Sequence, residues 1–254
     1  MLKKKLINLN KILYYKNQHL KKINNELDSF VYKTPHDLRA PLASMLGLIN
    51  IAKNESNVDE IKKYIELQER SVKKLDSYIA DILEITKNSN QDISYENINL
   101  SQLVEESLQQ LVYFHDSHKI KISTFINEQE KLYSDRYRLQ IILQNLLSNS
   151  IRYIDENKTT CIIEIHADVQ QYIFILKIVD NGIGIQKDHL DKIFDIFYRA
   201  SEKSKGSGLG LYIVLYIVKE NIARLGGNIT VDSEYGKGTT FTITLPNHTL
   251  LKNI

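Results

Sequence analysis

His36 and Asp37 are adjacent in the sequence, and a histidine beside a carboxylate could act as a nucleophile toward a terminal phosphate. The imidazole must be neutral to attack, and because its unperturbed pKa is about 6.5, much of a histidine population is neutral near pH 7. A carboxylate that holds the proton of one ring nitrogen leaves the lone pair of the other free. Since an isolated pair of this kind is usually an ordinary surface feature, its interpretation depends on the rest of the chain.

Asn145 and Asn149 are four residues apart, so on a helix they share one face. Their amide oxygens suit Mg²⁺, a hard cation that keeps some waters and bridges phosphate oxygens. Arg152 and Tyr153 follow on neighbouring faces, where a cation for phosphate and an aromatic ring beside a nucleotide would be useful. Asparagine in a helix also serves as a cap or as polar packing, and from these residues alone the two interpretations weigh equally.

Glycine is concentrated in the C-terminal part of the chain, where only Gly47 among the ten glycines precedes residue 182. This part is therefore expected to contain turns and close backbone approaches. Asp180 ends a predicted strand directly before Gly182 and Gly184, and three further glycines in residues 206–210 precede a predicted helix, whose first N–H groups could hold phosphate oxygens. Each pattern alone is weak, because Asp-Asn-Gly is most often a turn and Gly-x-Gly strings recur by chance.

The chain has 254 residues, of which 43% are hydrophobic and 25% are charged, as in ordinary globular proteins of about two domains. The longest unbroken apolar run, residues 211–218, is far shorter than the roughly 20 residues that span a bilayer. The single cysteine, Cys161, cannot form an intramolecular disulfide, which fits a reducing compartment. We therefore expect a cytoplasmic location, as a free protein or as the cytoplasmic part of a membrane-anchored protein.

Charge is distributed unevenly along the chain. Residues 1–30 hold seven Lys and two acidic residues, so the rest of the chain carries 26 basic against 29 acidic residues. A net negative body argues against nucleic-acid binding, and we expect no nucleic-acid partner. The Lys-rich start indicates either a solvated helix face or the cytoplasmic flank of a membrane segment outside this chain.

Apolar residues recur at steps of three and four through the first third of the chain, which predicts long helices. In residues 6–30 the steps form the a/d pattern of a coiled coil, which favours pairing with a second copy over a single amphipathic helix. The pattern continues to Ile49, and after a polar turn at Asn54–Asn57 it resumes in residues 58–82. Two copies of such a helical hairpin would form a dimeric four-helix bundle.

Short strands alternate with helices after the polar segment 88–96, which predicts an α/β sandwich with helices on one face of a sheet. The expected strands are Ile120–Ile126, Cys161–Ala167, Tyr172–Val179, Asn228–Val231 and Thr239–Leu245. The expected helices are Leu100–Phe114, Asp135–Tyr153 and Leu209–Leu225.

Several segments, in this order, resemble the sequence boxes of sensor histidine kinases of two-component systems. The segment His-Asp-Leu-Arg-Ala-Pro-Leu, which begins at His36, resembles the phosphoacceptor box. The other boxes are similar to residues 145–153 (N box), 180–185 (first glycine box), 194–197 (F box), 206–211 (second glycine box) and 236–241 (closing glycine-rich turn). The resemblance covers roughly residues 27–246, and boxes in this order at domain-like separations are very specific.

The resemblance implies a multidomain chain whose ATP-binding domain has the Bergerat-type α/β sandwich fold. The implied parts are a coiled-coil signal helix (1–29), a dimerisation and histidine phosphotransfer domain (30–88), a linker (89–97), a catalytic ATP-binding domain (98–247) and a tail (248–254). It further implies a homodimer that uses ATP and Mg²⁺ to phosphorylate His36 and passes the phosphoryl group to an Asp of a response-regulator receiver domain. The upstream sensor module would lie outside this chain.

The resemblance also assigns roles to individual residues. His36, Asp37 and Asn149 would be catalytic, with Asn149 the Mg²⁺ ligand, and Asp180 would accept a hydrogen bond from the adenine amino group. The other nucleotide-binding residues that it implies are Asn145, Arg152, Tyr153, Gly182, Gly184, Arg199, Lys205, Gly206, Ser207, Gly208, Leu209, Gly210 and Thr240. Residues 198–207, rich in Ser, Lys and Gly, are expected to form a lid over the nucleotide.

Three positions depart from the family pattern. Arg152 is more often Lys in this family, and a planar guanidinium changes the geometry of a phosphate contact. Members that dephosphorylate their partner commonly have Thr or Asn four residues after the histidine, so Ala40 predicts weak phosphatase activity. Pro35 costs about 3 kcal/mol inside a straight helix, so a kink or local unwinding is expected beside His36, and Pro41 predicts a further bend.

Two other classes of function stay open from the sequence. One is a non-catalytic dimer that binds ATP and regulates a partner through its conformation. The other is an ATPase or a Ser/Thr kinase on the same nucleotide-binding fold. The phosphoacceptor box around His36 favours the histidine kinase over both.

Overall fold

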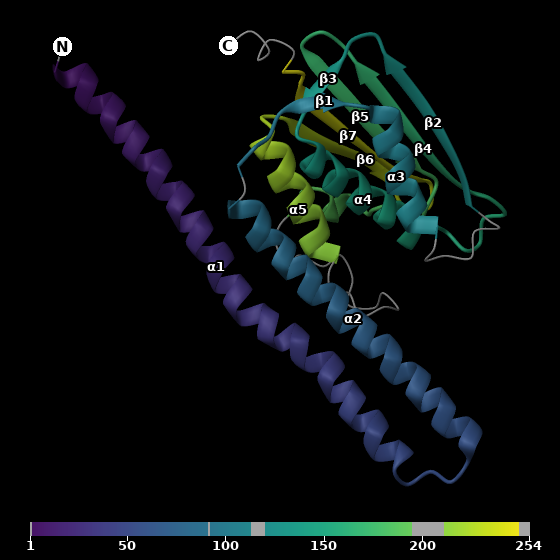
Figure 1. Ribbon diagram of the computed structural model, residues 1–254. Coiled ribbons are helices and arrows are strands. Elements are labelled where there is room, and N and C mark those ends of the chain that lie inside the picture. Colours follow the sequence, from purple (N-terminus) through teal and green to yellow (C-terminus); the bar gives the residue numbers. More distant parts are fainter. Residues whose placement is uncertain (1, 91, 113–119, 195–210, 249–254) are drawn as a thin grey trace. The chain divides into compact units, whose positions relative to one another are not determined.

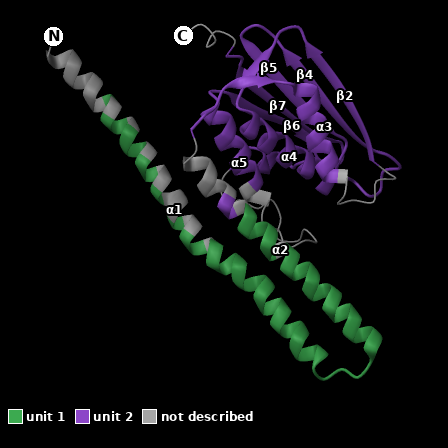
Figure 2. Ribbon diagram, viewed as in Figure 1, with its two compact units in different colours: residues 1–80, 205–209 green, residues 81–204, 210–254 purple. Residues whose placement is uncertain are grey.

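A computed structural model describes residues 2–90, 92–112, 120–194 and 211–248. The chain divides into two compact units, with residues up to Ala80 in the first and the described residues from Asp81 onward in the second (Figure 2). The first unit is helical, and the second combines a sheet with helices. The predicted order, an all-α hairpin followed by an α/β sandwich, is confirmed.

The first unit is built on two long antiparallel helices, α1 (Leu2–Ala52) and the part of α2 (Val58–Asn90) up to Ala80, which are joined by a short connection (Figure 1). In this connection the Glu55 carboxylate accepts the backbone N–H groups of Ser56 and Asn57 at 2.9 and 2.8 Å. The Asn57 side chain then accepts the N–H of Asp59 at 2.9 Å and so caps the start of α2. The predicted helices and their turn are therefore both present.

The helix α1 continues through Pro35 and Pro41 without a break. Of the two outcomes expected beside His36, local unwinding is therefore wrong for this structure, and the bend of the helix axis stays a prediction. A proline is accepted within a helix when the carbonyl of the preceding turn moves away from its ring.

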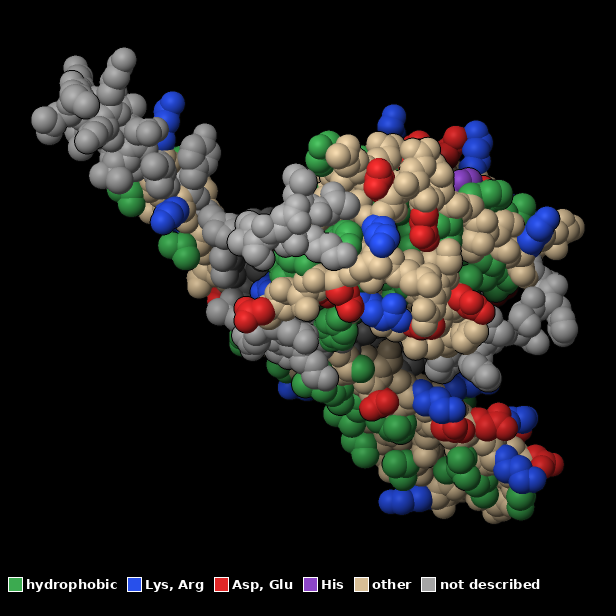
Figure 3. Space-filling view, turned by 45° about the horizontal axis from the view of Figure 1, so that its top comes forward, with side chains coloured by type: hydrophobic (Ala, Val, Ile, Leu, Met, Phe, Trp, Pro, Cys, Tyr) green, Lys and Arg blue, Asp and Glu red, His purple; other side chains and the backbone are tan. Residues whose placement is uncertain are grey.

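Much of the predicted apolar stripe of the hairpin is exposed in the single chain. Leu42, Ile49, Ile65, Val72 and Ile79 expose between 37% and 55% of their surface. Figure 3 shows hydrophobic side chains among charged ones along the hairpin. Because exposing so much apolar surface to water is unfavourable, this stripe supports pairing with a second copy, which stays a prediction.

The second unit contains a five-stranded sheet with the order β2-β4-β5-β7-β6. Its strands are β2 (Ile120–Glu128), β4 (Cys161–Val169), β5 (Ile173–Asp180), β6 (Asn228–Glu234) and β7 (Gly238–Pro246). Only β2 and β4 are parallel among these paired strands. Three helices cover one face: α3 (Leu100–Val112), α4 (Arg136–Arg152) and α5 (Leu211–Arg224) (Figure 1).

Every predicted strand of this sheet is present, and β4, β6 and β7 show the period-two alternation of a half-buried strand. In β4, for example, Cys161, Ile163 and Ile165 are buried under the helices, whereas Ile162 between them is exposed. Two three-residue strands, β1 (Glu96–Ile98) and β3 (Leu132–Ser134), were not predicted and pair antiparallel beside the main sheet. A short 3₁₀ helix, η2, spans Lys187–His189.

The helix α4 is held at its start by Asp135. This carboxylate accepts the N–H groups of Arg138 at 2.9 Å and of Ser94 at 2.9 Å, and it forms a buried ion pair with the Arg138 guanidinium at 2.7 Å. The cap fixes the first turn of the helix, which was expected at Asp135–Tyr153. Within the second unit, Asp135 thereby also holds the segment around Ser94 against the start of α4.

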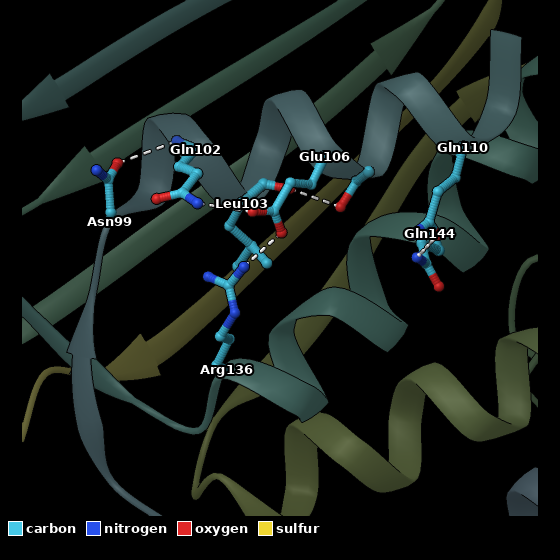
Figure 4. A network of polar contacts seen from close by, with 8 residues as sticks. Asn99, Gln102, Leu103, Glu106, Gln110, Arg136 and Gln144 are labelled. Atoms are coloured by element: carbon cyan, nitrogen blue, oxygen red, sulfur yellow. Dashed lines mark hydrogen bonds and ion pairs between the residues drawn. The ribbon is translucent and has the colours of Figure 1, made fainter.

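A polar network on the outside of the second unit joins α4 to α3 (Figure 4). Glu106 forms an ion pair with Arg136 and accepts a hydrogen bond from Gln102 at 2.8 Å, and Gln144 donates to Gln110 two turns further along α4. The opposite side of α4 is packed against the sheet by the buried Leu139, Ile142, Leu143, Leu146 and Leu147. With both sides fixed, the helix presents Asn145 and Asn149 in one defined orientation.

Candidate active site

His36 lies on α1 with its side chain 81% exposed, and its Nδ1 atom is 3.2 Å from Oδ1 of Asp37. The predicted pair is therefore formed by adjacent residues of one helix. Ala40 lies one turn further along and is also exposed. An imidazole held by a carboxylate on one nitrogen, and open to the solvent, can receive a group from a second molecule or a second domain.

Asp180 lies at the end of β5, where it joins that strand to α4. Its Oδ1 accepts the N–H of Gly182 at 2.9 Å, and its Oδ2 accepts the Ser150 hydroxyl at 3.3 Å. Burial raises the pKa of the Asp180 carboxyl, while these hydrogen bonds, another from the backbone of Thr239 and the charge of Lys158 act in the opposite direction. The result is a largely enclosed carboxylate that can still accept a hydrogen bond from a ligand.

Two glycines allow the main chain to approach Asp180 closely. A Cβ atom on Gly182 would clash with the carbonyl oxygen of Tyr153, and one on Gly238 would clash with the carbonyl oxygen of Asp180. Gly238 also has a φ of 140°, which L side chains rarely adopt. The end of α4, the end of β5 and the start of β7 therefore meet at one point.

Asn149 is 6% exposed, and neither its amide nitrogen nor its amide oxygen has a hydrogen-bond partner among the described residues. Buried polar groups without partners are rare, and they indicate a bound ion, water or ligand. The neighbouring Asn145 is half-buried and donates its amide N–H to the carbonyl of Ile141 at 2.8 Å. Its amide oxygen projects from the same helix face.

The structure brings most of the described site residues together at the C-terminal half of α4. Tyr153 ends the helix, and its carbonyl oxygen accepts the N–H of Ile183 at 2.9 Å, which holds the loop that contains Gly182 and Gly184 beside it. Arg152 is exposed in the same turn. The remaining predicted residues, Arg199, Lys205, Gly206, Ser207, Gly208, Leu209 and Gly210, and the predicted lid 198–207, lie outside the described residues.

Thr240 is not brought to this cluster. In the antiparallel pairing of β5 with β7, Asp180 is opposite Thr239 and Val179 is opposite Thr240, so Thr240 faces the other side of the sheet. Thr239 is only 7% exposed, shares the face of Asp180 and shares a hydrogen bond with the Ser233 hydroxyl at 3.0 Å. The alternation of β7 places Thr239 and Thr240 on opposite faces of the sheet. The sequence signal for Thr239 was therefore present, but only the strand register shows which of the two faces carries Asp180.

Two family models match the chain, one on each side of the boundary between the units. The model described as the His Kinase A (phospho-acceptor) domain matches residues 26–91, and that of the histidine kinase-, DNA gyrase B- and HSP90-like ATPases matches residues 134–249. The chain belongs to the sensor histidine kinases. The second match places Asn149 and Asp180 in an ATP-binding domain.

The chain is 33% identical over 227 residues to the methanogenesis regulatory histidine kinase FilI of Methanothrix harundinacea, which corresponds to 88% of this chain and 25% of FilI. It therefore spans about a quarter of the length of that relative. Two solved histidine kinases share the fold. The Acinetobacter baumannii kinase AdeS matches with a TM-score of 0.63 at 24% identity, over 84% of this chain and 98% of AdeS. The kinase ThkA, solved in complex with the response regulator TrrA, matches with a TM-score of 0.69 at 23% identity, over 92% of this chain and 66% of ThkA.

Within the described part of this histidine kinase, no helix combines the length and the apolar character that crossing a bilayer requires.

Proposed function

We propose that this chain transfers the γ-phosphate of ATP to His36 and then to an aspartate on the receiver domain of a response regulator. The observation that carries the proposal is the unsatisfied, buried amide of Asn149, which precedes the Ser150 that contacts Asp180, in a chain that also holds an exposed histidine–carboxylate pair. One part supplies a nucleotide site, and the other supplies an acceptor for the phosphoryl group. The exposed acceptor favours this function over a regulatory dimer or a simple ATPase.

The described residues fit ATP with Mg²⁺. The amide oxygen of Asn149 is a suitable Mg²⁺ ligand, and Asn145 lies one turn away on the same face. The Asp180 carboxylate would accept the adenine amino group, with Thr239 beside it in place of Thr240. When bound, Mg²⁺ neutralises charge on the phosphate oxygens. We retain Arg152, Tyr153, Arg199, Lys205 and the glycines of residues 206–210 as proposed contacts of the nucleotide.

The chemical step needs little from the acceptor besides a correctly protonated ring. With the Nδ1 proton held by Asp37, the Nε2 lone pair attacks the γ-phosphorus. The N–P bond forms as the P–O bond to ADP breaks, and the Asp37 carboxylate stabilises the positive charge that the ring acquires. Transfer to a carboxylate oxygen of the receiver aspartate breaks the N–P bond and restores the neutral imidazole.

We further propose that the active form is a homodimer whose four-helix bundle covers the exposed apolar stripe of the hairpin. A response-regulator receiver domain is the proposed protein partner, which the structure of ThkA bound to TrrA supports. The predicted domain boundaries, a cytoplasmic location, a sensor module outside this chain and the lack of a nucleic-acid partner are part of the same proposal.

The chemistry of the phosphorylated protein tests this function. The full chain is incubated with γ-labelled ATP and Mg²⁺, and the protein-bound label is exposed to acid and to base. Label on an imidazole nitrogen is expected to be lost in acid and kept in base. Base-labile, acid-stable label would indicate a Ser/Thr kinase, ATP turnover without label would indicate an ATPase, and binding without either would indicate a regulatory dimer.

The variant Asp180→Asn is expected to weaken ATP binding at least about tenfold. The Asp180 carboxylate would accept a hydrogen bond from the adenine amino group, whereas an amide NH₂ group at the same place is itself a donor.

The same variant should lose no stability at pH 7. Burial raises the folded-state pKa of Asp180 above its ordinary value of 3.8, so the folded protein binds the extra proton more tightly than the unfolded chain. The free energy of unfolding that this carboxyl contributes is therefore present at low pH and is lost as the pH rises through the folded pKa.

Titration calorimetry measures the ATP affinity of Asp180→Asn. Urea denaturation, from pH values below 3.8 up to pH 7, measures its free energy of unfolding relative to the wild type. Ser101→Ala, which removes an exposed hydroxyl of the same unit, serves as the control. Unchanged ATP affinity, or a large loss of stability at pH 7, would contradict the assigned role of the carboxylate.

The variant Ala40→Thr is expected to gain phosphatase activity toward a phosphorylated receiver domain. Ala40 is exposed one turn after His36, and its methyl group cannot orient a water molecule, whereas a threonine hydroxyl there can. We expect a gain of about tenfold or more in the rate of dephosphorylation, with the rate of autophosphorylation nearly unchanged. The measurement is the loss of label from a purified phosphorylated receiver, and substantial wild-type phosphatase activity that Ala40→Thr abolishes would refute the prediction.

A further inference from the structure

Lys158 lies between α4 and β4, and backbone carbonyl oxygens surround its ammonium group. The Nζ atom is 2.6 Å from the oxygen of Asn181, 3.1 Å from that of Gly236 and 3.2 Å from that of Lys237, with the oxygen of Gly182 at 3.5 Å. The three shorter distances match the three N–H donors of an ammonium group. No carboxylate of the described residues forms an ion pair with it, so its hydrogen bonds go to the main chain.

These carbonyl groups belong to two segments that are far apart in the sequence. Asn181 and Gly182 follow β5, whereas Gly236 and Lys237 form the turn between β6 and β7. Apart from the ladder between β5 and β7, the segments are joined by a hydrogen bond from the N–H of Gly236 to the carbonyl of Ile183 at 2.8 Å. Lys158 therefore bridges them from a third segment.

Both segments are connected directly to the carboxylate of Asp180. Gly182 donates its N–H to Oδ1 at 2.9 Å, and Thr239, two residues after the turn, provides a second backbone hydrogen bond. The direction of these N–H groups depends on how closely the loop and the turn are held together. Gly184 and Gly238 bring the loop and the turn into close contact, because a Cβ atom on Gly184 would clash with the carbonyl oxygen of Glu234 and one on Gly238 with that of Asp180. An added link between the two segments therefore acts on a contact that has little room to shift.

We propose that Lys158 is a positioning residue of the nucleotide site: it holds the loop after β5 against the β6–β7 turn and thereby orients Asp180 toward adenine without touching the nucleotide. The inference rests on the proposed function. The positive charge of Lys158 also supports this role. It favours the ionised form of the Asp180 carboxyl, which would accept a hydrogen bond from the adenine amino group.

The variant Lys158→Met removes the donors and the charge but keeps an unbranched stem. We expect the KM for ATP in autophosphorylation, and the Kd of ATP in calorimetry, to rise about tenfold. The rate at saturating ATP should change less than about twofold, because the acceptor histidine and the phosphate contacts are untouched. Lys158→Arg keeps the charge and several N–H donors, so its KM should stay within about threefold of the wild-type value.

Lys237→Met is the matched control, since this residue belongs to the same turn and its side chain is 72% exposed in an ion pair with Glu234 at 2.7 Å. It removes the same charge from the surface, and the KM for ATP should change less than about twofold. A rise below about threefold for Lys158→Met, or an equal rise for Lys237→Met, would overturn the proposal. A fall in the saturating rate with unchanged KM would also overturn it.

Three further outcomes are also informative. If Lys158→Met fails to fold, Lys158→Gln, which has two donors and no charge, is measured against the same threshold. Wild-type protein that binds ATP but takes up no label contradicts the proposed function, while the Kd ratios still decide the role of Lys158. Wild-type protein that binds no ATP overturns both.

Discussion

A His36→Gln variant is expected to take up no phosphoryl group from γ-labelled ATP while it retains wild-type affinity for ATP. Glutamine offers no ring nitrogen with a nucleophilic lone pair, so the N–P bond cannot form. The imidazole is 81% exposed, and a substitution at such a surface position usually changes the free energy of unfolding by less than about 0.5 kcal/mol. The loss of label therefore reports on chemistry and not on folding.

His166 provides the matched control for this experiment. It is 41% exposed and lies 2.9 Å from the carboxylate of Glu164, so it is a second exposed histidine–carboxylate pair, placed on β4 and not on α1. His166→Gln is expected to keep the wild-type rate of labelling. Acid-labile label that persists in His36→Gln, or that disappears in His166→Gln, would show that the acceptor is another residue. Titration calorimetry with ATP confirms that each variant still binds nucleotide.

Elements with local signals could be predicted from the sequence. The helix α4 was expected at Asp135–Tyr153, and those two residues are its N-cap and C-cap, because the capping side chain of Asp135 and the apolar period between them are both local features. The strands β4, β5 and β7 were predicted for the same reason, since alternation and β-branched residues are also local features. Asp180 and Gly182 followed, because Asp180 ends β5 and Gly182 lies two residues after it.

Features that depend on distant pairing could not be predicted. The strands β1 and β3 have three residues each, too few to show alternation, and they form only because Glu96–Ile98 meets Leu132–Ser134. The face that Thr239 shares with Asp180 could not be predicted either, because the register that places these two residues opposite each other joins strands about 60 residues apart. No sequence pattern indicated the role of Lys158, because its hydrogen-bond partners are main-chain carbonyl groups, which every residue has.

Two buried asparagines offer a matched pair for testing the nucleotide site. Asn149 is 6% exposed and Asn247 is 5% exposed. The amide of Asn149 has no partner among the described residues, whereas Asn247 accepts the N–H of Tyr133 at 3.0 Å and donates to the carbonyls of Lys131 at 3.0 Å and Gln170 at 2.8 Å. Burial is therefore equal, but only Asn247 contributes its hydrogen bonds to the fold.

We expect Asn149→Ala to lower the rate of autophosphorylation at least about 100-fold, because the proposed Mg²⁺ ligand is lost. The free energy of unfolding should stay the same or rise by about 1 kcal/mol, since alanine removes buried polar atoms that lack partners. Asn247→Ala is expected to show the opposite behaviour, with activity retained and about 1–3 kcal/mol lost, because three main-chain groups lose their partner. Initial rates of labelling and urea denaturation measure both quantities, and an equal loss of stability in the two variants would assign the Asn149 amide to the fold and not to the ligand.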